Sequence, residues 1–287
     1  MPPLAATGPN AEQIRYWNEH SGPRWVASEA MLDAQIAPLG LAAMERARVA
    51  AGERVLDVGC GCGQTTLQLA EKVGPRGGVT GIDISAPMLE RARARAAERE
   101  LAHARFLNAD AQTTRLGAAA FNLVFSRFGV MFFADPAAAF ANLRASLAPG
   151  GRVVFVCWQE LMRNPWMRVP LLAAAPHLPP LTPPAPGAPG PFAFADPVRV
   201  RGILEAAGFA DVAIDPFESD LALGGVGGNL EQAVEVVMGL GPLAAALREA
   251  AADLRLRVAA AVREAIAPYA TPAGVKLGSA AWIVRAV

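Results

Sequence analysis

Three glycines at alternate positions follow an acidic residue early in the chain. Asp57 ends an apolar run and is followed by Gly59, Gly61 and Gly63, after which the sequence turns helical. Glycine lets a ligand approach the backbone closely and permits positive φ, so such a loop presents bare amides to a bound molecule. The spacing predicts a small-molecule site at this loop, although many nucleotide-binding folds carry one.

The residues on either side of the loop limit the classes of ligand that it could bind. A dinucleotide-binding loop has the spacing G-x-G-x-x-G, which would place its third glycine at position 64, where this chain has Gln64. A carboxylate at Asp57 would repel a pyrophosphate but attract an amino group, directly or through a water. The alternative for Asp57 is a turn residue that accepts bonds from the loop's own amides. The pattern favours a ligand with an ammonium group.

Asp83 closes the second predicted strand, about 20 residues after the glycine loop. An acidic residue at this place in a nucleotide-binding α/β fold accepts bonds from both ribose hydroxyls. Ser85 is expected to cap the helix that follows, with Pro87 in its first turn. Met88 in that turn either flanks an adenine ring or packs the helix.

Polar groups also end the third and fourth predicted strands. Asp110 stands where it could accept a bond from an adenine amino group, and the Ala111 amide could donate to a ring nitrogen. The alternative for Asp110 is a solvated loop carboxylate. Ser126 ends the fourth strand, and the apolar residues 131–133 follow it. We expect the reacting end of the ligand and its acceptor to meet there.

The elements that must position these residues alternate along the chain. β-branched runs separated by alanine- and leucine-rich helical stretches predict a parallel sheet with helices on both faces. The predicted strands are residues 54–58, 79–84, 104–108, 121–126 and 152–158.

The flanking segments are predicted to form a helical cap and an acceptor side. We divide one compact domain into a cap (1–49), an α/β core (50–160) and a late segment (161–287). In the cap we expect helices broken near residues 21–23 and 38–40, and in the proline-rich residues 165–197 we expect neither a helix nor a central strand. The late segment should begin with a helix over 198–207 that ends at Gly208, a strand over 211–216 and a break at 224–228. It should end with one apolar helical face over 243–266 and a last strand over 275–287. The proline-rich segment is interpreted as a surface loop or a substrate-covering lid.

Four segments in this order resemble a known family. Residues 55–63, 81–89, 109–111 and 147–153 are similar to the motifs of class I S-adenosylmethionine-dependent methyltransferases, in the small-molecule branch similar to ubiquinone and menaquinone biosynthesis methyltransferases. The resemblance implies a doubly wound seven-stranded α/β sheet in the order 3-2-1-4-5-7-6 with the last strand antiparallel. It also implies S-adenosyl-L-methionine as cofactor and S-adenosyl-L-homocysteine as product.

The resemblance extends to the residues around the cofactor. Tyr16 and Trp25 are arranged as in glycine N-methyltransferases, where an aromatic pair covers the cofactor, although packing of the cap predicts the same aromatics. The expected cofactor-binding residues are Tyr16, Trp25, Asp57, Gly59, Gly61, Asp83, Ile84, Met88, Asp110, Ala111 and Ser126.

Methyl transfer from a sulfonium is an in-line displacement, which needs alignment and exclusion of water more than a nucleophilic side chain. If a general base is used, His20 and His177 are the candidates, with Asp215, Glu218 and Glu160 as carboxylate alternatives. The cap, residues 128–133 and the segment from Trp158 onward should wall an acceptor that is partly apolar or aromatic.

The composition of the chain indicates which binding partners, metals and cellular location to expect. Lys plus Arg equals Asp plus Glu at 26 each, which argues against nucleic acid. The sequence shows neither a signal peptide nor about 18 uncharged apolar residues in a row, so we expect a cytoplasmic protein. Three cysteines without zinc-ligand spacing indicate no metal. Arginine and alanine richness is typical of a GC-rich, bacterial genome. Self-association stays open.

Two other functions compete with methyl transfer. An NAD-dependent oxidoreductase shares the strand, the glycine loop and the acidic second strand, but Gln64 and Asp57 argue against it. A non-catalytic module that keeps an S-adenosylmethionine pocket for regulation or assembly has the same motifs.

Overall fold

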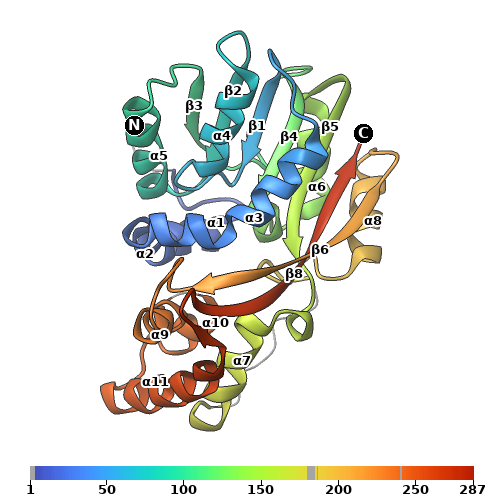
Figure 1. Cartoon of the computed structure of the whole chain (residues 1–287). Coiled ribbons are helices and arrows are strands. Elements are labelled where there is room, and N and C mark those ends of the chain that lie inside the picture. Colours follow the sequence, from blue (N-terminus) through green and yellow to red (C-terminus); the bar gives the residue numbers. More distant parts are fainter. Residues whose placement is uncertain (1–3, 180–184, 186, 240) are drawn as a thin grey trace.

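A computed structural model describes residues 4–179, 185, 187–239 and 241–287. Its centre is one sheet in the order β3-β2-β1-β4-β5-β8-β6, with a short β7 paired to β8 (Figure 1). β8 is antiparallel to β5 and lies between β5 and β6, so the expected order with its antiparallel last strand is confirmed. The strands are β1 (Arg54–Val58), β2 (Gly78–Asp83), β3 (Ala104–Asn108), β4 (Phe121–Arg127), β5 (Leu147–Trp158), β6 (Ala213–Leu223), β7 (Ala270–Thr271) and β8 (Gly274–Ala286).

The central strands β1 and β4 are buried on both faces along most of their length, which is why they read as largely apolar runs. Leu56, Val124 and Phe155 are fully buried in the main core. The parallel register pairs Asp57 with Gly81 and Asp83 with Asn108. The carboxyl ends of β1, β2 and β3 therefore meet at one edge of the sheet.

Helices cover the sheet, and the N-terminal ones lie below the carboxyl ends of the strands in Figure 1. The cap consists of two short helices and one long helix, with a break at His20 beside the predicted one. The helices of the cap and core are α1 (Ala11–Glu19), α2 (Ser21–Ala27), α3 (Glu29–Ala47), α4 (Gln64–Val73), α5 (Ala86–Glu98), η1 (Gly129–Phe132), α6 (Pro136–Ser146) and α8 (Pro197–Ala206).

The predicted break near residues 38–40 is wrong, because α3 continues through Pro38. Pro38 lies on the exposed side of the helix, so water can reach the carbonyl that its missing N–H leaves free. Ile36 and Leu39 are buried in the main core. Packing of that face keeps the helix intact.

The late helices form a lobe below the sheet with an apolar cluster of its own (Figure 1). β6 and β8 extend from the sheet into this lobe, and Leu223 and Val275 are among its buried residues. Its helices are η2 (Leu161–Arg163), α7 (Pro165–Ala174), η3 (Ala175–His177), α9 (Leu230–Gly239), α10 (Gly241–Ala246), α11 (Ala252–Ile266) and η4 (Ala267–Tyr269).

The expectation that no helix forms in residues 165–197 is wrong for its first part. α7 begins at Pro165, where a missing N–H costs no helical bond, and it continues through Pro170. Met167, Pro170 and Ala174 are buried on one face, which offsets the bond lost at Pro170. The lid interpretation depends mainly on residues 180–184 and 186, which lie outside the described residues.

The predicted apolar face over residues 243–266 is shared by two helices rather than one. α10 ends at Ala246 and α11 begins at Ala252, yet Leu247 and Val258 lie in the same apolar cluster. The helix over 197–206 is followed by Gly208 at φ 87, and the glycines after β6 form the predicted break.

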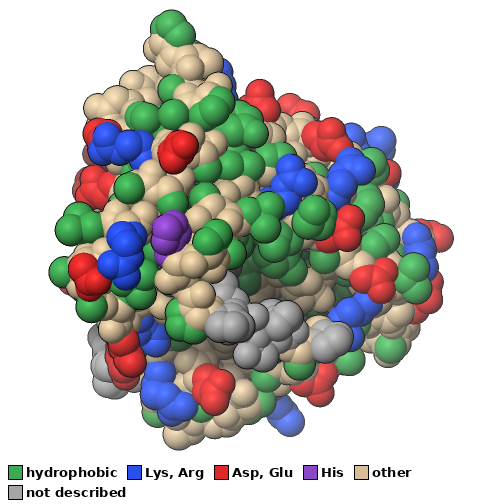
Figure 2. Space-filling view, turned by 90° about the horizontal axis from the view of Figure 1, so that it is seen from below, with side chains coloured by type: hydrophobic (Ala, Val, Ile, Leu, Met, Phe, Trp, Pro, Cys, Tyr) green, Lys and Arg blue, Asp and Glu red, His purple; other side chains and the backbone are tan. Residues whose placement is uncertain are grey.

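Seen from below, basic and acidic side chains are interspersed over the face of the molecule, and apolar side chains line a hollow between them (Figure 2). Within the part of the chain that the structure describes, no helix combines the length and apolar character needed to cross a bilayer.

Candidate functional site

The glycine loop takes the backbone conformation that its residues predict. Gly59, Gly61 and Gly63 have φ values of 68°, 54° and 83°, which side chains rarely tolerate. A Cβ on Gly59 would lie 2.5 Å from the Cα of Gly129 in the turn after β4. The loop is therefore pressed against the neighbouring strand end as it passes from β1 into α4.

Asp57 is fully buried at the end of β1. Its Oδ2 accepts hydrogen bonds from the Thr65 hydroxyl at 2.7 Å and the Thr66 hydroxyl at 2.6 Å, both on the first turn of α4. Its Oδ1 is buried without a partner among the described residues. Burial raises the pKa of Asp57 to about 6, and the two hydroxyls oppose this rise.

The turn-residue alternative for Asp57 is not what the structure contains, because hydroxyls of α4 hold the carboxylate instead of loop amides. An unpartnered buried carboxylate oxygen is costly unless a donor reaches it. This oxygen fits the ammonium group that the sequence predicts.

Asp83 is half-buried beside the same loop. Its Oδ2 accepts the Gly61 amide at 2.8 Å, and its Oδ1 accepts the Ser85 amide at 2.8 Å. Burial raises the pKa of Asp83, while these amides lower it. The carboxylate is held at the loop edge, and each oxygen retains a second lone pair for a hydroxyl.

Ser85 takes the position before α5, but its expected capping bond is wrong. Its hydroxyl donates to the Trp17 carbonyl at 2.8 Å, because α1 packs directly against this turn. Met88 is buried, and a Cβ on Gly61 would lie 2.8 Å from its methyl carbon. Met88 therefore touches the glycine loop.

Asp110 is buried rather than solvated. The side-chain amide of Asn10 donates to its Oδ2 at 2.9 Å, and the backbone amide of Gln112 donates to its Oδ1 at 2.8 Å. The amide of Ala111 makes no hydrogen bond within the described residues, so it is available to a ligand.

Ser126 and Ile84 have structural partners. The Ser126 hydroxyl donates to the Val58 carbonyl at 2.7 Å and accepts the Gly129 amide at 3.2 Å. The Ile84 carbonyl accepts the Asn18 side chain at 2.9 Å. Both residues tie the strand ends together, and Ser126 shapes the site through the backbone that it holds.

Sequence reasoning missed the asparagines that dock the cap. Asn10 bonds Asp110 and also accepts the Ala134 amide at 2.8 Å, and Asn18 accepts the Ala86 amide at 2.9 Å. Their signal was a spacing of four, because Asn10, the buried Ile14 and Asn18 share one helical face. Their partners are distant in sequence and give no local sign.

A buried charge cluster supports the loop from behind. Arg127 donates to Gln64, the residue in place of a third glycine, and lies 3.4 Å from the carboxylate of Asp33. Arg95 contacts the same carboxylate at 2.8 Å. Burial lowers the pKa of Arg127, and Asp33 opposes this by favouring the charged guanidinium. The cluster joins α3 to α4, α5 and the end of β4.

Aromatic rings wall the space beyond the strand ends. Phe128 stacks on Trp158 with ring centroids 4.0 Å apart, and Trp17 of the cap meets Phe132 edge-on at 5.4 Å. Phe133 instead packs on Phe140 in the core, so part of the expected wall is buried. Sequence reasoning also missed Trp17.

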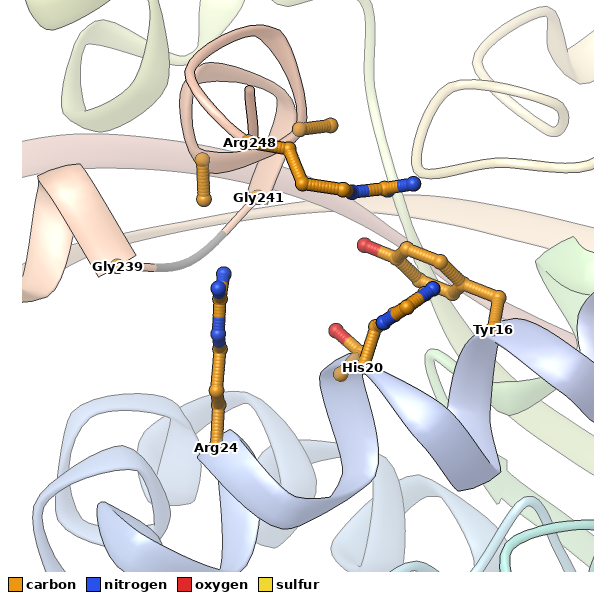
Figure 3. A pocket seen from close by; sticks show the side chains of 9 residues that line it. Tyr16, His20, Arg24, Gly239, Gly241 and Arg248 are labelled. Carbon is orange, nitrogen blue, oxygen red and sulfur yellow. The ribbon is translucent and has the colours of Figure 1, made fainter. Parts of the chain in front are cut away.

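The predicted aromatic pair lies on either side of Trp17, and Tyr16 contacts Trp17 edge-on with ring centroids 5.6 Å apart. Trp25 packs against the main core and contacts Trp17 edge-on, with ring centroids 6.1 Å apart. Tyr16 points toward the lower lobe, where the Arg248 guanidinium lies 5.8 Å from its ring (Figure 3).

The candidate bases lie at the surface. His20 and His177 are both exposed, on the cap and in η3. Asp215 is paired with Arg46 at 2.9 Å. The other two carboxylates are also exposed: Glu218 pairs with Arg163, and Glu160 lies just after β5.

The sheet order, the glycine loop and the acidic strand ends define a nucleotide-binding α/β fold of the methyltransferase type. Residues 55–151 match the family model described as a methyltransferase domain. By this similarity, residues 55–151 form a methyltransferase domain.

Curated relatives match this part of the chain. The aklanonic acid methyltransferase DauC of Streptomyces sp. (strain C5) is 41% identical over 118 residues, which cover 41% of this chain and 54% of the relative. The demethylmenaquinone methyltransferase of Geobacillus sp. (strain WCH70) is 34% identical over 111 residues, which cover 39% of this chain and 47% of the relative. The chain spans about half the length of the curated relatives it matches.

The crystal structure of the YcgJ protein of Bacillus subtilis shares the fold. It is 16% identical, with a TM-score of 0.55, over 86% of this chain and 96% of that chain.

Proposed function

We propose that this chain transfers a methyl group from S-adenosyl-L-methionine to a small-molecule acceptor at oxygen, nitrogen or carbon, leaving S-adenosyl-L-homocysteine. The observation that carries the proposal is the unpartnered, buried Oδ1 of Asp57 beside a loop of positive-φ glycines. A carboxylate there suits an ammonium and disfavours a pyrophosphate.

The three acidic strand ends suit the three parts of this cofactor. Asp57 would bind the ammonium, Asp83 the ribose hydroxyls, and Asp110 with the Ala111 amide the adenine edge. Met88, in contact with the loop, would flank the adenine. Adjacent strand ends in the order β1, β2, β3 support one extended ligand across all of these groups.

Catalysis would come from alignment and exclusion of water. The bound cofactor supplies an activated methyl group on a sulfonium. The residues of the chain hold the acceptor in line with that carbon, and the rings of Trp17, Phe128 and Phe132 keep water out. The proton lost by a hydroxyl or amine acceptor would pass to solvent or to His20 or His177.

The acceptor is proposed to be flat and partly apolar. The half-buried ring of Phe128, backed by the buried Trp158, offers an aromatic surface, and the relatives named above act, by their names, on aklanonic acid and demethylmenaquinone. The cap (1–49) and the late segment (161–287) would enclose it against the core (50–160).

The cofactor half is tested by melting temperature in millimolar S-adenosylmethionine, S-adenosylhomocysteine or NADH. We expect a rise with the first two and none with NADH. The proposal is refuted if neither S-adenosylmethionine nor S-adenosylhomocysteine raises the melting temperature. Stabilisation by NADH alone would favour the NAD-dependent oxidoreductase instead.

The transfer half is tested by mass spectrometry of quinone, phenol and carboxylic acid acceptors incubated with the cofactor. A gain of one methyl supports an enzyme. Tight cofactor binding without turnover across the panel would favour the non-catalytic module.

We further infer a bacterial protein of the cytoplasm that acts on no nucleic acid. Bacterial relatives and the balanced charge support this inference. Gel filtration with light scattering would test self-association.

A further inference from the structure

A hollow lies where the cap meets α10 of the lower lobe (Figure 3). Tyr16, His20 and Arg24 line it from α1 and α2, and Arg248 lines it from just beyond α10. The opposite face of the cap is the one docked on the core, through Asn18 and its bonds to the turn before α5. The hollow is therefore on the lobe side of the cap.

Two arginines extend into this hollow without a carboxylate. Neither Arg24 nor Arg248 forms an ion pair with any described residue, and the undescribed positions hold only Met, Pro, Leu and Thr. Glu249 follows Arg248 but makes no ion pair within the described chain. Like charges gathered in a partly enclosed space favour binding of an anion.

The other groups of the hollow suit a small planar anion. The ring of Tyr16 lies under the Arg248 guanidinium and holds it over the opening. The Tyr16 hydroxyl and Ser21 add donors, and the lobe contributes the small residues Gly239, Gly241, Ala244 and Ala245. The hollow is small and partly open to solvent. That space accommodates one functional group rather than a whole ligand.

We propose that this hollow binds a carboxylate group of the methyl acceptor, so that the substrate class is an aromatic or partly apolar acid. The inference rests on the proposed function. Guanidinium groups match a carboxylate through paired, charge-assisted hydrogen bonds. Binding would join the cap and the lower lobe around the acceptor, because Arg24 belongs to one and Arg248 to the other.

The test uses 2-naphthoate and its uncharged amide, 2-naphthamide, as probes in calorimetric titrations at saturating S-adenosylhomocysteine. The wild-type protein should bind the carboxylate about tenfold more tightly than the amide, the effect of one charged hydrogen bond. Arg24→Gln and Arg248→Gln should each remove that preference. Arg105→Gln is the matched control, because it removes the same charge from an exposed position on β3.

Arg24 and Arg248 are exposed, so the variants should fold and bind S-adenosylhomocysteine as the wild type does. Equal affinity for both probes, no binding of either probe, an unchanged preference in both variants, or displacement by millimolar inorganic phosphate would overturn the carboxylate assignment. Failure of the wild type to bind S-adenosylhomocysteine would instead refute the proposed function.

Discussion

Replacing Asp57 by asparagine should stabilise the free protein and weaken cofactor binding. The pKa of Asp57 rises from 3.8 to about 6 because the carboxylate is buried. Each pH unit of such a difference corresponds to about 1.4 kcal/mol, so the ionised group costs the fold up to about 3 kcal/mol. The folded protein binds the proton of Asp57 more tightly than the unfolded chain does, so this group favours folding most below about pH 4. That advantage is lost as the pH rises through about 6.

At pH 8, Asp57→Asn removes this buried charge, so the free energy of unfolding should increase by up to about 3 kcal/mol, less any loss at the two threonine hydroxyls. The same change removes a charged hydrogen bond to the ammonium, worth about 1.5–3 kcal/mol, or about 10- to 150-fold in affinity. Stability and binding should therefore change in opposite directions.

Urea unfolding at pH 5 and pH 8 measures the first effect, and titration with S-adenosylhomocysteine measures the second. Wild-type affinity should rise from pH 5 to pH 7 as Asp57 ionises, while the variant should show no such rise. Asp253→Asn, at an exposed carboxylate paired with Arg257, is the control: it should leave binding unchanged and should not raise the stability at pH 8. Wild-type affinity in Asp57→Asn at pH 8 would refute the assignment of this oxygen to the ammonium.

Three further changes test the fold and the site. Gly59→Ala should lower stability by about 2 kcal/mol or more in urea unfolding, since its Cβ meets backbone at positive φ, whereas Gly202→Ala in exposed α8 should raise it by about 0.5–1 kcal/mol. Asn10→Ala should cost about 1–3 kcal/mol in the same assay, because Asp110 loses a buried donor. Trp158→Leu should weaken 2-naphthoate binding by about threefold to tenfold in calorimetry and leave S-adenosylhomocysteine affinity unchanged.

Each of these has a clear contrary result. Equal effects of alanine at Gly59 and Gly202 would contradict the loop geometry. Wild-type stability in Asn10→Ala would show that the cap is not docked through Asp110. If Trp158→Leu weakened binding of 2-naphthoate and S-adenosylhomocysteine equally, Trp158 would belong to the cofactor site instead of the acceptor site.

Local sequence determined the frame of this protein. Strands β1 and β3 lie at the predicted residues, 54–58 and 104–108. In β1 the reason is burial of every residue after Arg54, because a strand buried on both faces reads as a largely apolar segment. The parallel arrangement then brought Asp57 and Asp83 to one edge, since the carboxyl ends of parallel strands coincide. The glycine spacing predicted positive φ because only glycine adopts it freely.

Tertiary structure decided what local sequence leaves open. Helix α3 continues through Pro38 because its other face is buried, and Ser85 bonds Trp17 instead of its own helix. Asn10 reaches Asp110 across 100 residues of sequence, and Arg24 meets Arg248 in one hollow only after the lobe packs under the cap. Such contacts depend on how elements pack and not on propensity, so a single sequence predicts the cofactor side of the site and leaves the acceptor side to the fold.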